Sequence, residues 1–587
     1  MEAKKLISLL LFTFIFAALS TNLFLHDSNE IQYFFIIRKL RSLVLGIQRG
    51  WHCNSASNGN GVQTEQPVRR AFLSPNLSTC HQSLTDADVP IYCCPPKRES
   101  EEPFIDFQLP DPSLPLRVRR PAHLVDEEYI AKYNKAISIM KSLPYDDPRN
   151  FMRQANVHCV YCSGAYDQQN SNNTILKIHR SWLFFPWHRM MLYFHERIVA
   201  SIIGDDTFAL PFWNWDVPDG MRIPVMYMNG SFADKDRDTS HLPPQVADIH
   251  FDYVESGFSP QDQIASNVAF MYTQMVSGAK KTELFMGCPY KAGDEGFCDG
   301  PGTIELAPHN ALHTWVGSNL NPERENLGAF YSAARDPIFY AHHSNIDRLW
   351  EVWRGLQGNN KGEIHDPDWL DSYFFFHNEK LQLVRIKIRD VLDITKLGYA
   401  YERVPLLWLN ARPEPSMPPK IARYMLKMRD SHNGLLLSSH TNSANFEPEG
   451  RILDTTIRAK VHRPKTHRTK EEKEEEEEVL VVYGIDVKKD VYLKFDVFVN
   501  AVDGETTIGP ESREFAGTFV HMRRGVRLVM NKGETTVKRK TNLKLGISEL
   551  LEDLEADGDE SIWVALVPRG GTGMHISVDG IRIEYMR

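Results

Sequence analysis

Two groups of histidines, both set among aromatic residues, constrain the fold of this 587-residue chain more than any other feature. His309 and His313 are spaced i and i+4, which places both imidazoles on one face of a helix. Residues that bind one ion must meet in space, so distant segments have to pack together. The first group comprises His158, His179 and His188, and the second comprises His309, His313 and the adjacent pair His342 and His343.

The doubled pattern favours metal binding, although a single histidine near apolar residues is more often a hydrogen-bonded core residue. Three neutral imidazoles per ion, without a carboxylate, are poor ligands for magnesium, calcium or a facial-triad iron. Cys159 and Cys162 form a CxxC pair, but no second such pair completes a four-thiolate zinc site. The pattern therefore favours two copper ions, with O2 as the co-substrate.

Helical spacing or helix-start signals mark residues 125–143, 186–203, 308–316 and 342–355. From Val479 onward, alternating apolar residues divided by turns indicate antiparallel strands. The predicted fold is a mainly α copper domain, a four-helix bundle that holds a dicopper centre, followed by a C-terminal antiparallel β-sandwich domain. Asp347, four residues after His343, is predicted to orient an imidazole or to pair with Arg348.

Composition limits the remaining possibilities. Hydrophobic residues make up 42% of the chain and charged residues 24%, as in soluble globular proteins. The formal charge of -9 argues against nucleic acid as a partner. The acidic run Glu471–Glu478 is interpreted as a solvated linker in preference to an acidic docking surface. The predicted divisions are a leader (1–20), a pro-segment or arm (21–79), a catalytic domain (80–412), a linker (413–478) and a β-domain (479–587).

The N-terminus has the layout of a secretory signal peptide, with Lys4 and Lys5 followed by the apolar run Leu6–Leu19. An uncleaved membrane anchor is the alternative. Three Asn-x-Ser/Thr sequons fit a lumenal route and predict a glycoprotein. They begin at Asn76, Asn172 and Asn229.

Eight cysteines are compatible with disulfides in an oxidising compartment. The adjacent Cys93 and Cys94 cannot readily bridge each other, so Cys80 and Cys159 are candidate partners. Cys288 and Cys298 bracket a Gly-rich loop. Whether they pair with each other is left open.

Several motifs in order resemble the plant polyphenol oxidase family, the type-3 copper enzymes that include tyrosinases and catechol oxidases. The resemblance covers about Cys80 to Arg587. Its copper-domain motifs are HCVYC at His158, PWHR at Pro186, PFWNWD at Pro211, PHNALH at Pro308 and DPIFYAHHSNID at Asp336. Later motifs are DWL at Asp368, YAY at Tyr399 and KFDV at Lys494.

The resemblance implies a role for each matching position. The first copper would be bound by His158, His179 and His188, and the second by His309, His313 and His343, with His342 as a neighbour. Cys162 would form a thioether to His179, and Phe330 would be the bulky gate residue over the first copper. The implied disulfides are Cys80–Cys94 and Cys93–Cys159.

Glu305 and Asn310 resemble the family's water-holding pair, which can deprotonate a monophenol. The chain is therefore expected to oxidise o-diphenols to o-quinones and to hydroxylate monophenols, with small phenols and O2 as its partners. The alternatives are a catechol oxidase without monophenolase activity and a hemocyanin-like oxygen carrier.

The C-terminal domain resembles the shielding domain of a latent proenzyme, and Lys470–Glu478 is expected to be an exposed target of an activating protease. The leader lacks the Ser-rich composition of a chloroplast transit peptide. The predicted location is the secretory pathway, in the vacuole or outside the cell, with the thylakoid lumen as the alternative. The oligomeric state is not predicted.

Overall fold

The computed structural model describes residues 72–81, 83–84, 90–96, 102–169, 174–254, 256–294, 300–358, 362–433, 450–487, 492–502, 508–522, 527–528 and 540–587. The chain separates into Met1–Arg69 and Arg70–Arg587, and all described residues belong to the second part. The predicted leader, most of the predicted arm, Asn172 and Cys298 lie outside the described residues. Within them, no helix has both the length and the apolar character needed to cross a bilayer.

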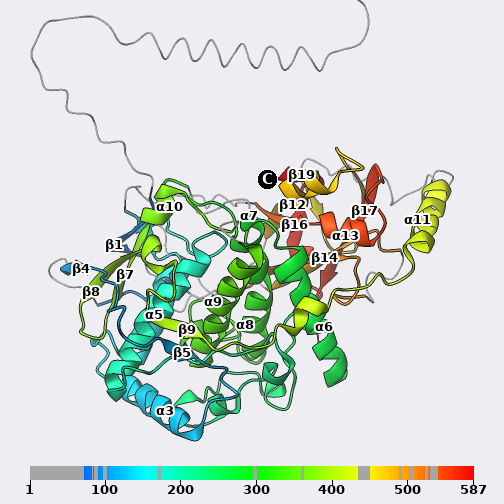
Figure 1. Ribbon diagram of the computed structural model, residues 1–587. Helices are drawn as coiled ribbons and strands as arrows, with labels where there is room; N and C mark the ends of the chain where they lie inside the picture. Colours follow the sequence, from blue (N-terminus) through cyan, green and yellow to red (C-terminus); the bar gives the residue numbers. More distant parts are fainter. Residues whose placement is uncertain are drawn as a thin grey trace, which may run out of the picture. The chain divides into compact units, whose positions relative to one another are not determined.

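Helices form the larger part of the fold (Figure 1). Asp126 caps the first of them by accepting from the Tyr129 N–H at 2.8 Å, and Asn150 caps the second by accepting from the Met152 N–H at 2.9 Å. The third ends at Gly204, whose left-handed backbone, with φ of 66°, suits glycine. The main helices are α3 (Glu127–Ser142), α4 (Phe151–Cys162), α5 (Phe184–Ile203), α8 (Asn310–Val316) and α9 (Ile338–Gln357).

The helical bundle differs from the prediction in two ways. Helix α4 was not predicted, although His158 and Cys162 are spaced i and i+4 along it. The predicted helix at 308–316 is shorter, because η6 (Glu305–His309) contains Ala307 in an extended conformation and α8 starts only at Asn310. Both differences lie in segments where polar residues interrupt the apolar period.

Short elements complete the helical domain. The helical ones are η1 (Pro218–Gly220), η2 (Val225–Met228), η3 (Gly230–Phe232), η4 (Thr239–His241), α6 (Pro260–Tyr272), η5 (Thr273–Ser277), α7 (Thr282–Met286), η7 (Ala333–Arg335), α10 (Pro367–Asp371), η8 (Ile388–Val391) and η9 (Leu407–Asn410). Small sheets pair β1 (Pro75–Cys80) with β6 (Tyr166–Gln168) and β5 (Arg117–Arg119) with β9 (Tyr399–Tyr401). In a third sheet, β8 (Leu383–Lys387) lies between β4 (Phe104–Asp106) and β7 (Tyr373–His377).

The C-terminal part is a sandwich of two sheets, as predicted. One sheet has the order β10-β18-β12-β16 with β19 also on β12, and the other has the order β11-β17-β13-β14. Side chains from both sheets, such as Val482 and Phe495, share one buried core. The strands are β10 (Arg451–Ile452), β11 (Ile457–His462), β12 (Glu477–Val487), β13 (Leu493–Val499), β14 (Phe515–His521), β16 (Thr541–Gly546), β17 (Ser561–Arg569), β18 (Ile576–Val578) and β19 (Gly580–Met586). Two short helices, α13 (Ser548–Asp553) and η10 (Gly573–His575), join them.

Much of the described part of the predicted linker, residues 413–433 and 450–478, is folded, which corrects its interpretation as a solvated connection. Residues 419–433 form a helix, α11 (Pro419–Asn433), and β10 and β11 already pair with β18 and β17 of the sandwich. The acidic run forms α12 (Lys470–Glu475) and the start of β12. The structured β-domain therefore begins at β10 and not at residue 479.

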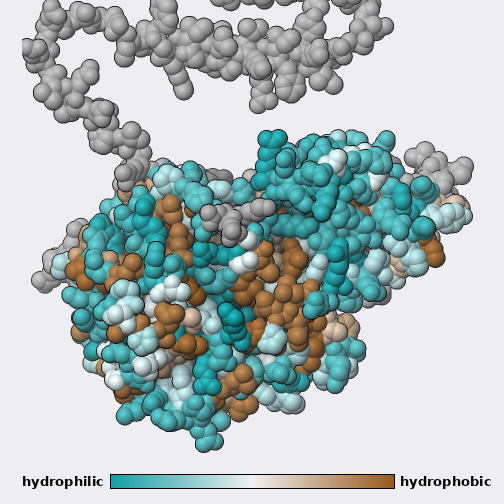
Figure 2. Space-filling view, viewed as in Figure 1, coloured by the Kyte–Doolittle hydropathy of each residue, from teal (hydrophilic) through white to brown (hydrophobic). Residues whose placement is uncertain are grey.

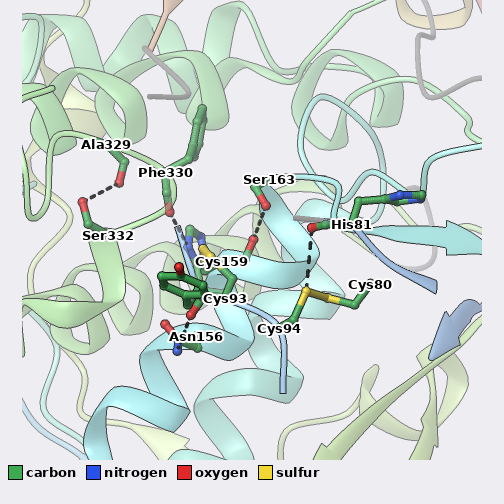
Figure 3. The surroundings of a disulfide bond; sticks show 12 residues. Cys80, His81, Cys93, Cys94, Asn156, Cys159, Ser163, Ala329, Phe330 and Ser332 are labelled. Carbon is green, nitrogen blue, oxygen red and sulfur yellow. Dashed lines mark hydrogen bonds between the residues drawn. A yellow bond between two sulfur atoms is a disulfide. The ribbon is translucent and has the colours of Figure 1, made fainter. Parts of the chain in front are cut away.

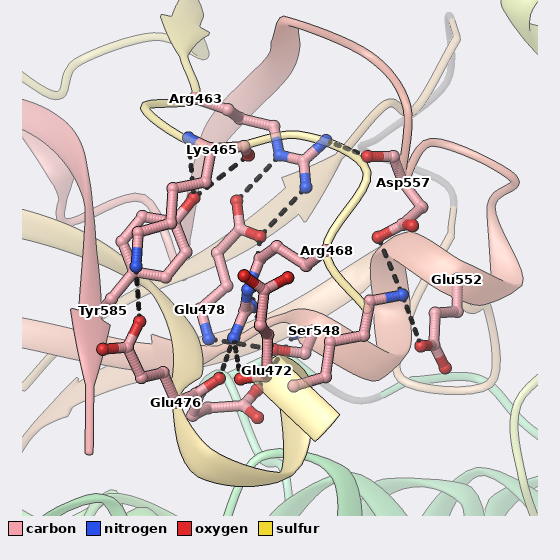
Figure 4. Close-up of polar contacts among 12 residues, drawn as sticks. Arg463, Lys465, Arg468, Glu472, Glu476, Glu478, Ser548, Glu552, Asp557 and Tyr585 are labelled. Atoms are coloured by element: carbon pink, nitrogen blue, oxygen red, sulfur yellow. Dashed lines mark hydrogen bonds and ion pairs between the residues drawn. The ribbon is translucent and has the colours of Figure 1, made fainter. Parts of the chain in front are cut away.

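A buried ion pair explains how the acidic run is incorporated (Figure 4). Glu478 is 1% exposed and accepts two hydrogen bonds from Arg463, at 2.7 and 2.9 Å. Its backbone N–H also donates to Ser548 Oγ at 2.8 Å. A bidentate guanidinium offsets the desolvation of the carboxylate, so part of a highly charged segment can enter the core.

The β-domain packs directly on the helical domain. β14 contacts η6 and α8, and Leu306 of η6 belongs to the core of the sandwich. Phe498 and Phe515 of the sandwich in turn belong to the core of the helical domain. β15 (Arg527–Leu528) also pairs with β2 (Ser83–Leu84) of the N-terminal arm, which continues to β3 (Pro90–Ile91). The two domains therefore share apolar cores and a small sheet.

Replacing Glu478 with Gln should lower the free energy of unfolding by about 3–5 kcal/mol, because it leaves the buried Arg463 charge uncompensated. Urea denaturation of the full chain, followed by circular dichroism, measures the change. Glu474→Gln is the matched control, because this neighbouring side chain is 69% exposed and lies 4.0 Å from Lys470. We expect the control to change stability by less than about 0.5 kcal/mol. Equal effects of the two changes would contradict a structural role for the buried pair.

Candidate metal centre

The first histidine group meets where α4, α5 and the loop before α5 converge. His158 lies on α4, His188 on α5 and His179 in the loop. Ring centroids are 5.9 Å apart for His158 and His179, 5.6 Å for His158 and His188, and 5.1 Å for His179 and His188. The fold thus brings together three residues that the sequence separates by 30 positions.

Backbone carbonyls hold two of these rings. His158 Nδ1 lies 3.0 Å from the Phe330 carbonyl oxygen, and His188 Nδ1 lies 2.7 Å from the Phe184 carbonyl oxygen. A carbonyl can only accept, so Nδ1 carries the proton in both imidazoles. Nε2 is left with a free lone pair in each ring.

The second group comes from η6, α8 and α9. His313 Nδ1 lies 2.8 Å from the Leu327 carbonyl oxygen, which again leaves Nε2 as the acceptor. The rings of His309 and His313 are 4.5 Å apart. His342 and His343 follow each other on α9 and complete this group.

Both groups fit a metal ion with a preference for imidazole. Within each group, one ligand atom per residue lies within 4.8 Å of the others. Nε2 of His158, His188 and His309 is buried and has no hydrogen-bond partner among the described residues. Burial lowers the pKa of these three imidazoles well below the usual value and keeps them neutral. Buried lone pairs without a partner are costly, and an ion between them would satisfy them.

The adjacent histidines of α9 have different surroundings. His343 Nε2 lies 3.2 Å from His313 Nε2, and the His343 ring stacks on that of His188 at 4.3 Å. The His342 ring lies 6.2 Å from Trp213 and 6.0 Å from Trp215. His343 therefore lies between the two groups, whereas His342 contacts the second group and the two tryptophans, with its ring 5.6 Å from that of His309 and 4.9 Å from that of His313.

Cys162 lies one helical turn after His158 and belongs to the first group by distance. Its thiol takes part in no disulfide. Burial raises its pKa well above the usual value, and the nearby Glu305 carboxylate adds to the shift. The predicted thioether partner, His179, is in the same cluster.

Two disulfides involve the N-terminal segment of the described chain, and the one at Cys159 attaches it to the bundle (Figure 3). They join Cys80 to Cys94 and Cys93 to Cys159, which is the pairing that the resemblance implied. Cys159 is the residue next to His158 on α4. Cys288 is buried, and its suggested partner Cys298 lies outside the described residues.

Glu305 is a buried carboxyl group at the edge of the first histidine group. Its Oε1 lies 3.0 Å from His179 Nδ1 and accepts from the Arg180 N–H at 2.7 Å. Oε2 is buried without a hydrogen-bond partner among the described residues. Burial raises the pKa of Glu305 to about 8. The group is a carboxyl that can hold or release a proton beside a histidine.

The two other predicted site residues also contact histidines. Asn310 Oδ1 lies 3.0 Å from His309 Nδ1, so its amide orients that ring. The Phe330 ring lies 4.7 Å from the His179 ring. The structure therefore brings the predicted copper ligands, Cys162, Glu305, Asn310 and Phe330 to one region.

A buried polar cluster behind the site was not foreseen in the sequence analysis. Asp347 pairs with Arg189 of α5 at 2.5 Å and accepts from Tyr399 at 2.7 Å and Tyr401 at 2.6 Å. The predicted pair with Arg348 is wrong, because Arg348 binds Asp216, at 2.5 Å. The cluster ties α9 to α5, the helices that carry His343 and His188. The YAY motif could have indicated this cluster in the sequence, because its two tyrosines lie on one face of β9 and can donate to the same carboxylate.

Comparisons with protein families cover most of the described chain. Residues 148–356 match the common central domain of tyrosinase. Residues 363–414 match the polyphenol oxidase middle domain, and residues 450–585 match the chloroplastic polyphenol oxidase C-terminal domain. The start of the last match agrees with the start of β10.

Characterised relatives match at high identity. Aureusidin synthase from Antirrhinum majus is 46% identical, over 87% of this chain and 88% of its own. A chloroplastic polyphenol oxidase from Malus domestica is 45% identical, over 88% of this chain and 85% of its own. The compartment in the latter name agrees with the alternative location, the thylakoid lumen, and the secretory prediction is not confirmed.

The solved structures that match this chain are of two kinds, which cover different fractions of it. Latent apple tyrosinase superimposes with a TM-score of 0.72 at 44% identity, over 83% of this chain and all of its own. An active aurone synthase superimposes with a TM-score of 0.54 at 36% identity, over 57% of this chain and all of its own. Since these relatives are enzymes, the oxygen-carrier alternative is not supported. The chain belongs to the plant polyphenol oxidase family, copper-dependent oxidoreductases that act on phenols.

Proposed function

We propose that this chain uses O2 to oxidise o-diphenols to o-quinones and to hydroxylate monophenols, and that the full-length chain is latent. The observation that carries the proposal is the pair of buried histidine groups, in which Nε2 of His158, His188 and His309 has no hydrogen-bond partner among the described residues. One copper ion would be held by His158, His179 and His188, and the other by His309, His313 and His343. When bound, the two ions supply electron transfer between the phenol and O2.

The protein positions these ligands and excludes water. Carbonyl acceptors fix the tautomer of His158, His188 and His313, so their Nε2 atoms point to the centre without rearrangement. The Trp213 and Trp215 side chains are fully buried beside α9 and keep this region dry. Preorganised, dry ligands lower the cost of binding the ions.

Monophenol hydroxylation requires a base for the phenolic proton, and Glu305 has the properties of one. Its Oε2 is buried without a partner among the described residues, and burial raises its pKa to about 8. The neighbouring Asn310 amide can share a water molecule with Glu305, as the family resemblance implies. A catechol oxidase without monophenolase activity would not need this pair.

Latency is supported by the contacts of β14 with the site. His521 of β14 accepts from the Arg180 guanidinium at 2.6 Å, and Arg180 directly follows His179. The structure of the latent enzyme matches 83% of this chain, whereas that of the active enzyme matches 57%. An activating protease would therefore have to cut before β10, because a cut within Lys470–Glu478 leaves β11 attached to one part and β12 to the other. We place the enzyme in the thylakoid lumen, in agreement with its chloroplastic relative.

Replacing His343 with Asn should reduce bound copper from about two ions per chain to about one, whereas His342→Asn should retain both. Copper is measured in purified, folded protein by elemental analysis, and circular dichroism verifies folding. If only the His342 variant loses one copper ion, His342 is the ligand and His343 is its neighbour.

Replacing Asn310 with Gly should lower the rate on a monophenol roughly tenfold to a hundredfold, with a smaller effect on an o-diphenol. The reason is that only the monophenol needs its proton removed by a water positioned in this way. Both rates are measured by oxygen uptake per bound copper. Asn310→Asp is the control, because it preserves an acceptor for His309 Nδ1. If the Gly variant loses the same fraction of its rate on both substrates, the role of Asn310 is to orient His309 and not to position a water molecule.

Ending the chain after Asn433 should raise kcat/KM on a bulky o-diphenol by at least about tenfold, the factor that corresponds to ~1.4 kcal/mol of lid binding. The end at Asn433 removes the whole sandwich, whereas an end after Pro464 would leave β10 and β11 without their partners. The assay compares both forms at equal copper content. A truncated enzyme no faster than the full chain would disprove latency.

A further inference from the structure

α11 leaves a row of apolar side chains exposed. Ile421 is 53% exposed, Tyr424 64%, Met425 42% and Met428 43%. Their spacing of i, i+3, i+4 and i+7 places them on one face of the helix. Figure 2 shows apolar atoms at the outer edge where Figure 1 draws α11, beside a mainly hydrophilic β-domain surface.

This face is distinct from the one that attaches α11 to the protein. Ala422 and Leu426 are buried against Val502 and pack with Trp563 of β17. Each of these two residues follows a member of the exposed row, so the docking face lies on one side of that row. The helix is therefore anchored to the β-domain along one side and keeps a second apolar face outward.

Positive charges border the other side of the row. Lys420 and Lys427 are exposed and directly precede Ile421 and Met428. Arg423 also lies on that side and pairs with Asp559 at 2.5 Å. The sequence has no acidic residue between Glu414 and Asp430, although the whole chain carries a formal charge of -9.

An apolar row bordered by lysines is the pattern of a helix that lies in the surface of an anionic membrane. The apolar side chains enter the boundary between headgroups and acyl chains, while the lysine stems extend so that their ammonium groups remain among the phosphates. α11 has 15 residues and is about 22 Å long, enough to lie along a bilayer surface.

A second copy of the chain fits this face less well. Four side chains on one short helix cover far less than the roughly 800 Å² per partner that a stable protein interface buries. Two copies would also bring lysine rows of like charge together. An anionic lipid surface satisfies both the apolar row and the charges.

We propose that α11 is a membrane-surface anchor that binds anionic lipid headgroups reversibly and holds the β-domain at a bilayer. This inference is independent of the copper centre, since no residue of α11 belongs to it. The interaction is weak and salt-dependent, because it combines a small apolar area with screened charges.

Cosedimentation of the full-length, copper-loaded enzyme with vesicles tests the anchor. The vesicles are phosphatidylcholine alone, or phosphatidylcholine with about 30% phosphatidylglycerol, at low and high salt. The wild type should sediment with the anionic vesicles at low salt and remain in solution with the neutral ones. The Tyr424→Ser/Met428→Ser and Lys420→Gln/Lys427→Gln variants should each reduce the bound fraction at least about threefold.

Val225→Ser/Leu320→Ser is the matched control, because these residues are exposed apolar side chains of the helical domain, at 69% and 85%. It should bind as the wild type does, and all variants should keep their circular dichroism spectrum and o-diphenol activity. Three results would overturn the proposal: no wild-type binding to anionic vesicles, unchanged binding of the Tyr424/Met428 variant, or a wild-type dimer in sedimentation velocity that this variant abolishes. The last result would assign the face to a second copy of the chain.

Discussion

The constraint on which the rest of the structure depends is the burial of the neutral imidazoles of His158, His188 and His309, whose Nε2 atoms have no hydrogen-bond partner among the described residues. Such lone pairs cost free energy in a dry core, so the surrounding fold must hold them for a ligand that satisfies them. The Phe330, Phe184 and Leu327 carbonyls fix the Nδ1 side of three rings. The Asp347 cluster joins the two helices that carry His188 and His343. The disulfide at Cys159 ties the arm to the helix of His158.

The relation between the two domains follows from where their cores meet. Leu306 of η6 belongs to the core of the sandwich, and the same short segment contains Glu305 and His309. Arg180 connects His179 to His521 through one side chain. The β-domain therefore contacts the site through the residues adjacent to its ligands. This geometry explains how the β-domain can control the access of substrate to the copper site, although none of its described strands carries a predicted copper ligand.

Sequence reasoning predicted much of this fold. The α5 and α9 helices and the later sandwich strands have regular apolar periods, and period is what determines which face is buried. The prediction was wrong in the segment whose composition is dominated by charged residues. Glu477 and Glu478 looked like solvated linker residues, but they start a buried strand because Arg463 lies opposite Glu478. α4 was missed because Arg153, Gln154 and Asn156 interrupt its apolar residues and obscure the helical period.

The sequence by itself determined the chemistry of the site: the imidazole donors, the motif order and the family follow from residue types and their spacing along the chain. Only the tertiary structure decided how these residues are used. It packed both His342 and His343 against His309 and His313, stacked His343 on His188 as well, moved the β-domain boundary back to β10 and exposed one face of α11. These outcomes depend on contacts between residues far apart in the chain, and local spacing contains no information about such partners.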